Sequence, residues 1–134
     1  MKLSLVSILP LLAVAAGLTS LPAAARSGPD KSLLHVARAT RMEQRCNEQA
    51  MGVIQREQKG MRPDELVAYA FADTHLKDDT IHAPGAAVRS RGHWYHLSYK
   101  CTTSDDGMDI KAFSYKLGEE VPKDQWSAHY LVPP

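Results

Sequence analysis

The residues best suited to recognition are concentrated in one segment, residues 84–101. Two arginines, Arg89 and Arg91, are followed closely by Trp94 and His96. Two guanidinium groups beside an aromatic ring suit a carboxylate, a sugar acid or an acidic protein surface, because a planar guanidinium can donate paired hydrogen bonds to such groups. We expect Arg89, Arg91, Trp94 and His96 to form a binding patch. The alternative is a solvated turn whose arginines only shield the tryptophan.

Three histidines, His82, His93 and His96, could ligate a metal if the strands that carry them were neighbours. Neutral imidazole is a common ligand of zinc and copper. His93 and His96 are three residues apart, however, so in a strand their side chains point to opposite faces. We therefore expect ordinary surface histidines and no metal site.

Enzyme motifs fit the chain poorly. No serine lies in a GxSxG motif, and an oxidised cysteine is not a nucleophile. The cluster of Asp105, Asp106 and Asp109 lacks the spacing of a calcium loop and is typical of a solvated turn. The sequence therefore predicts a non-catalytic protein without a cofactor.

The first 25 residues have the features of an export signal. A basic start is followed by an apolar run from Leu3 to Leu18, which Pro10 interrupts, and Ala23–Ala25 fits the small-residue cleavage pattern. The run is too short for a convincing membrane span. We expect cleavage after Ala25, and a periplasmic or secreted product that is not inserted in the membrane.

Charge and cysteines set further limits on the mature chain. Removal of Lys2 with the signal leaves equal numbers of basic and acidic residues, which argues against a nucleic-acid partner. Two cysteines remain, Cys46 and Cys101, and in an exported protein such a pair most often forms a disulfide. The alternative is two buried thiols.

One amphipathic helix is expected over about residues 41–59. Thr40 and Glu43 match a capping box, and Gly60 is a natural stop. Apolar residues at three- and four-residue spacing predict a single buried stripe that includes the first cysteine. The members of this stripe are Met42, Cys46, Ala50, Val53 and Ile54.

Strands should follow the helix. Residues 66–72 fit a strand slightly better than a helix, and residues 84–101 predict a hairpin with Gly92 at its turn. A second turn at Asp106–Gly107 leads to a strand over 108–115, which Gly118 should end. A helical turn over 121–126 should dock Trp126.

These elements predict an α+β domain, a long N-terminal helix on a small antiparallel meander, over residues 40–134 after a short segment 26–39. Alternation after His93 places Cys101 on one strand face with Tyr95, Leu97 and Tyr99. The other face carries Trp94, His96, Ser98 and Lys100. A bond between Cys46 and Cys101 would require the helix to cover the first face.

The chain resembles a family of small exported alphaproteobacterial proteins, catalogued as domain of unknown function 930. The resemblance rests on segments 42–51, 67–72, 83–92 and 94–101, on Phe113-Ser114-Tyr115 and on Trp126. It implies export and a paired-cysteine domain, and it implies no activity, ligand or catalytic residue.

Two classes of function therefore remain. The first is a non-catalytic binding or inhibitor-like module of the cell envelope, whose partner is an envelope protein or an acidic ligand. The second is a structural or stress-related envelope protein without a ligand site. A histidine-based metal-binding role is less well supported. A groove beside Trp94 would favour binding, whereas a fully covered tryptophan would favour the structural role.

Overall fold

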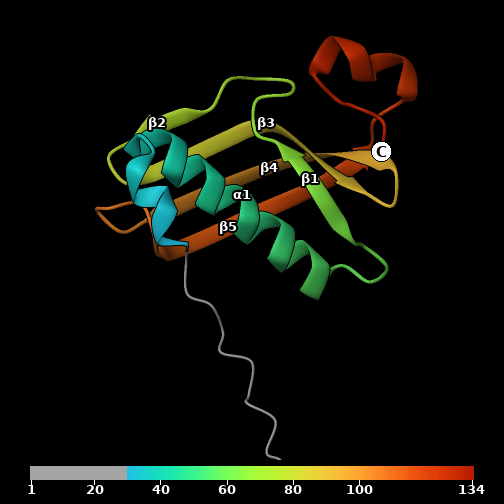
Figure 1. The fold of residues 1–134 in the computed structure, drawn as a ribbon. Helices are drawn as coiled ribbons and strands as arrows, with labels where there is room; N and C mark the ends of the chain where they lie inside the picture. The colour runs from blue at the N-terminus through green and yellow to red at the C-terminus, as the bar shows by residue number, and fades with distance from the viewer. Residues whose placement is uncertain (1–29) are drawn as a thin grey trace, which may run out of the picture.

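A computed structural model describes residues 30–134, in which one helix lies across one face of an antiparallel sheet (Figure 1). The expected signal peptide (1–25) and residues 26–29 lie outside the described residues. None of the helices in residues 30–134 has the length and apolar character needed to cross a membrane. In chain order the elements are η1 (Lys31–His35), α1 (Arg38–Glu57), β1 (Pro63–Val67), β2 (His75–Lys77), β3 (Thr80–Ser90), β4 (His93–Thr103), β5 (Ile110–Glu120) and η2 (Lys123–His129).

Helix α1 confirms the predicted apolar stripe but begins earlier than expected. Met42, Cys46, Ala50 and Ile54 are buried, as their spacing predicts, whereas the fifth member, Val53, is only half-buried. The predicted capping box is wrong, because the helix starts at Arg38 and its first turn has no side-chain cap. Tertiary contacts fix this end instead: Arg41 and Arg38 donate hydrogen bonds to backbone carbonyls of η1 and of the two loops that flank β3 and β4. These carbonyls belong to Leu33, Leu34, Val36, Asp78, Asp105 and Asp106.

The sheet has the strand order β1-β3-β4-β5, and β2 pairs with β3 beyond the end of β1. Every neighbouring pair is antiparallel. The predicted hairpin is confirmed: β3 and β4 pair from Ser90 opposite His93, and the turn residues Arg91 and Gly92 both have positive φ. Such a turn matches the twist of the two strands.

The segment 66–72 is a strand only as far as Val67, so the helix alternative is wrong and the strand is shorter than predicted. Residues 68–72 turn away and pack against an irregularity of β3, where the Phe71 N–H donates to the carbonyl of Gly85 at 2.7 Å. A Cβ at Gly85 would lie 2.3 Å from the backbone nitrogen of Ala72. This close approach ends the strand.

Strand β5 runs through Gly118 to Glu120, so the prediction that Gly118 ends it is wrong. Gly118 lies against His96 of β4, and a Cβ there would be 2.9 Å from the His96 Cβ. The glycine therefore permits close contact between neighbouring strands and does not break the strand. The turn at Asp106–Gly107 is confirmed, with Gly107 at φ 75°.

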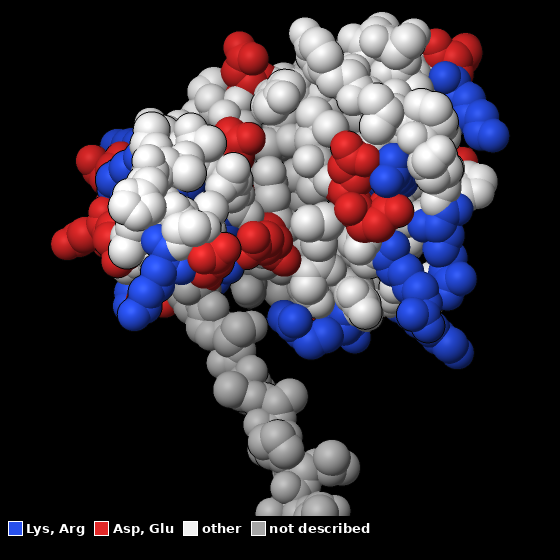
Figure 2. All heavy atoms as spheres, viewed as in Figure 1, with Lys and Arg blue, Asp and Glu red and all other residues white. Residues whose placement is uncertain are grey.

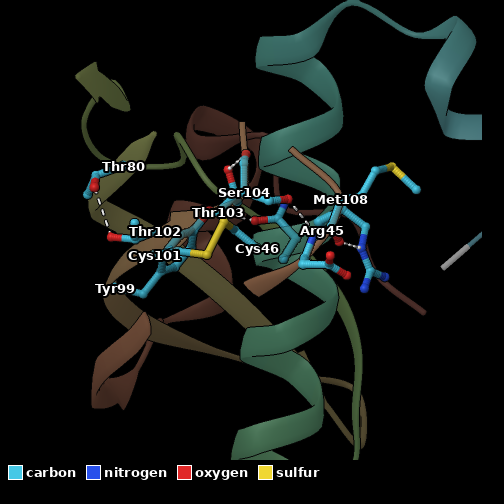
Figure 3. Close-up of a disulfide and its surroundings, with 11 residues drawn as sticks. Arg45, Cys46, Thr80, Tyr99, Cys101, Thr102, Thr103, Ser104 and Met108 are labelled. Carbon is cyan, nitrogen blue, oxygen red and sulfur yellow. Dashed lines mark hydrogen bonds between the residues drawn. A yellow bond between two sulfur atoms is a disulfide. The ribbon is translucent and has the colours of Figure 1, made fainter. Parts of the chain in front are cut away.

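The described residues form two apolar clusters on opposite faces of the sheet. The larger lies between α1 and the face of β4 that carries Leu97, Tyr99 and Cys101. A disulfide joins Cys46 of α1 to Cys101 of β4 inside it (Figure 3). The chain is therefore an α+β domain with a helix-to-sheet disulfide. The smaller cluster, around Trp94 and Trp126, lies where η2 and the C-terminal residues cover one end of the other face.

Candidate functional site

Trp94 is wholly buried, so the prediction that it serves as an exposed binding residue is wrong. Its indole Nε1–H donates to the carbonyl of Val132 at 2.9 Å, and its ring packs with Val121 and Trp126. The predicted docking of Trp126 is confirmed, and this docking covers Trp94. A buried indole satisfied by a backbone carbonyl stabilises the fold and cannot contact a partner.

Arg89 is committed to contacts inside the fold. Its side chain is 12 % exposed and forms ion pairs with Asp64 and Glu65 of β1, each at 2.9 Å. It also donates to the carbonyls of Val132 and Pro133 at 3.3 Å. The hydrogen bond to the Asp64 carboxylate raises the pKa of Arg89. The guanidinium therefore ties β3 to β1 and to the C-terminal residues.

Arg91 lies apart from Arg89 and from the tryptophan. It is exposed at the hairpin turn, and its Nε–H donates to the carbonyl of Gly60 at 2.8 Å in the loop after α1. The two arginines thus hold different segments, and they do not form the joint patch that their spacing predicts.

His96 is half-buried, and the other two candidate histidines lie elsewhere. The His96 ring lies 4.3 Å from the Phe71 ring, His93 pairs with Glu120, and His82 is beside His75 on β2. No group of three or more metal-ligating side chains occurs in residues 30–134. The predicted opposite orientation of His93 and His96 explains why these rings do not meet.

The part of the sheet left uncovered by η2 carries rows of polar side chains. One row crosses four strands, since the register places His75 opposite His82, His82 opposite Lys100, and Lys100 opposite Ser114. The rows on either side contain Lys77, Thr80, Thr102 and Ala112, and Ser98 with Lys116. We call this surface the open face and define it by Lys77, His82, Ser98, Lys100, Ser114 and Lys116.

Three shallow hollows adjoin one another on the open face. Lys116 and Ser98 line both the hollow of about 270 Å³ over β4 and β5 and the neighbouring one of about 230 Å³. The second hollow is bordered by Phe71 and His96. His82 and Lys100 are shared with a third hollow of about 380 Å³ beside β2. Small side chains in the middle of the strands leave the sheet accessible here.

The charges on the open face are mostly positive. Within the described residues, Lys77, Lys100 and Lys116 form no ion pair, and Asp78 is the acidic residue at the rim of the hollows. The helix side differs: Figure 2 shows acidic and basic side chains intermixed there. An ion pair such as Arg45 with Glu48 lies on that side. An uncompensated cationic surface attracts acidic groups.

Another hollow, of about 700 Å³, lies at the end of β4 and the loop that follows it, and its lining includes Asp79, Asp105, Asp106 and Asp109. Two of these four carboxylates have partners: Asp79 pairs with Arg38, and Asp106 accepts hydrogen bonds from Ser104 and the Met108 N–H. The Ser104 hydrogen bond is the main reason why the pKa of Asp106 is lowered. Asp106 therefore stabilises the turn before β5. Asp105, Asp106 and Asp109 are exposed in this turn, as the sequence predicts.

Two titratable groups, the buried Tyr99 and the half-buried Glu43, lie between α1 and the sheet. Burial, and secondarily the charge of Glu43, raises the pKa of Tyr99, whose hydroxyl donates to the Asn47 side chain at 2.7 Å. Burial also raises the pKa of Glu43 itself. Tyr99 lies on the face of the sheet that α1 covers and Glu43 lies on α1 itself, so neither belongs to the open face.

The sequence predicts that His96, Ser98 and Lys100 share the face away from the helix, but it gives Lys100 no binding role and does not identify Lys116. The signal was present in the alternation of β4, which puts Ser98 and Lys100 on the same face as His96. The same alternation in β5 puts Ser114 and Lys116 there.

Comparison with curated proteins and with solved structures finds no match. A family model matches residues 33–131, which include all of α1 and the whole sheet. The chain therefore belongs to the family described as Domain of Unknown Function (DUF930).

Proposed function

We propose that this chain is an exported, non-catalytic binding module of the alphaproteobacterial cell envelope, and that its open face binds an acidic segment of another envelope protein. The observation that carries the proposal is the pair Lys100 and Lys116. They are exposed on neighbouring strands, have no acidic partner in residues 30–134, and lie among serine side chains.

The open face suits a protein segment better than an isolated small anion. Its hollows are shallow and extend over several strands, so a ligand must be extended to fill them. Lysines offer charge, and Ser98 and Ser114 offer hydroxyl groups to carboxylates and backbone groups. The hollow beside Phe71 and His96 adds an aromatic border that an apolar side chain of the same segment could contact.

Export is inferred from the amino-terminal residues and from the disulfide. The basic start, apolar run and Ala23–Ala25 motif support cleavage after Ala25. The bond between Cys46 and Cys101 supports an oxidising compartment, because thiols in the cytosol are kept reduced. Periplasm and secreted space both meet this condition.

The second candidate, a structural envelope protein without a ligand site, has support from Arg89 and Trp94. These are two of the four residues predicted to bind a partner, and both donate hydrogen bonds that hold the C-terminal segment. Under this alternative the open-face lysines only keep the surface soluble, and charge reversal there has no effect on any interaction.

A binding titration separates the two candidates. The probe is an oligoglutamate peptide of about ten residues, long enough when extended to cross the sheet. We expect wild-type protein to bind it with an affinity that falls as salt is raised, and the variant K100E/K116E to bind about tenfold or more weakly.

The matched control is K59E/R62E, which makes the same change in net charge on the helix side, where both residues are exposed. This control should retain most of the affinity. Equal losses in both variants, or tight binding to anionic phospholipid vesicles with none to the peptide, would contradict the proposed partner.

A further inference from the structure

Strand β5 forms one edge of the sheet, and no strand in residues 30–134 pairs with its outer side (Figure 1). It is 11 residues long, whereas β1 and β2 at the opposite edge have 5 and 3 residues. An edge strand of this length presents unpaired N–H and C=O groups that can accept another strand. The edge is therefore a potential interface.

The side chains of β5 support this role. Phe113, Tyr115 and Leu117 contact the core under α1 but remain only partly buried. Apolar side chains left half-covered along an edge gain burial when a second strand is added beside them. Irregular pairing at both ends of β5 leaves residues 112–117 as its regular part, which limits an added strand to about this length.

We infer that β5 pairs antiparallel with β5 of a second copy of this chain, with Tyr115 opposite Tyr115 of the second copy. This register places Phe113 opposite Leu117 twice, which joins the two half-covered apolar rows. It also places Lys116 opposite Ser114 twice, and the ammonium group can donate a hydrogen bond to the hydroxyl. Directly opposite pairs of these kinds stabilise a sheet.

The two neighbouring registers are less favourable. If Lys116 lies opposite its own copy, two ammonium groups face each other at the centre of the interface, and like charges directly opposite destabilise a sheet. If Ser114 lies opposite its own copy, Leu117 faces Lys111 and loses its apolar partner. The side chains of β5 therefore specify the register about Tyr115.

This dimer does not depend on the proposed acidic partner, but it would extend the open face. A twofold axis perpendicular to the sheet keeps both helices on one side and both open faces on the other. Lys116 of each copy then lies near Ser114 of the second copy. The two lysine rows become one continuous surface across the shared sheet.

Sedimentation velocity of the disulfide-bonded protein over a range of concentrations tests the inference. We expect a concentration-dependent dimer for the wild type. S114K, which places lysine opposite Lys116 of the second copy, should weaken the dimer about tenfold or more, whereas S114E, which places a carboxylate there, should strengthen it. A wild type that remains a monomer at every concentration overturns the inference, as does an S114E variant that dimerises no better than S114K.

Single cysteines test the register itself. Under mild oxidation Y115C should form a disulfide-linked dimer, because the residue faces its own copy across the interface. S114C and K116C should cross-link much less. Faster cross-linking of S114C or K116C than of Y115C would contradict the register. Each variant is first compared with the wild type in thermal unfolding, so that only folded protein is scored. Peptide binding measured on the same samples tests the proposed function separately.

Discussion

Arg89 lies directly opposite Trp94 across the β3–β4 hairpin, with the guanidinium carbon 5.6 Å from the centre of the indole. The same guanidinium pairs with Asp64 and Glu65, and both the arginine and the tryptophan donate hydrogen bonds to Val132. Residues that the sequence predicts to bind a partner therefore hold the C-terminal segment against the sheet.

The two arginines should consequently behave differently when each is replaced by alanine. Arg89→Ala removes two ion pairs, two hydrogen bonds and the contact with the indole, so we expect a loss of about 1–2 kcal/mol in the free energy of unfolding. Arg91→Ala removes one exposed hydrogen bond and should cost less than about 0.5 kcal/mol. Urea unfolding of both variants checks this. Equal effects would contradict the structural role of Arg89.

The disulfide should contribute a large part of the stability. Cys46 and Cys101 are 55 residues apart, and closing a loop of that length stabilises a fold by about 4 kcal/mol in the chain-entropy model. The variant C46A/C101A should lose about this amount in urea unfolding. Non-reducing peptide mapping of the wild type should recover one linked peptide pair. Free labelling of both native thiols would contradict the bond.

Glu43 should make stability depend on pH. Burial raises its pKa above that of the unfolded chain, so folding favours the protonated carboxyl. The stability it contributes is present below the unfolded pKa and is lost as pH rises through the folded pKa. Glu43→Gln should therefore be more stable than the wild type at neutral pH, and the difference should shrink as the pH falls below the carboxyl pKa. A difference in melting temperature that does not change with pH would contradict this.

Local patterns in the sequence predict much of the fold. The helix stripe, the Gly92 turn and the face of Cys101 follow from spacing alone, because each depends on residues that are close in sequence. The end of β1 does not, since it is set by the contact of Phe71 with Gly85 across the chain. Likewise, Gly118 has the composition of a strand break, and only its contact with His96 explains why β5 continues.

The candidate site was only partly predictable for the same reason. Trp94 and Arg89 have the chemistry of a binding patch, and only the path of residues 121–132 reveals that they are covered. Lys100 and Lys116 become neighbours only when β4 and β5 pair in this register, which the sequence does not specify. His96 is the one predicted binding residue that borders this face, within the described residues.

A chemical-shift titration tests whether the open face binds an acidic segment, because it locates the binding surface. Isotope-labelled protein is titrated with the oligoglutamate peptide, and the amide shifts are followed residue by residue. We expect the largest changes at Lys77, Ser98, Lys100, Ser114 and Lys116, with little change along α1. Changes concentrated instead at Arg56, Lys59, Arg62 and Arg91, or spread evenly over the surface, would contradict the open face as the binding site.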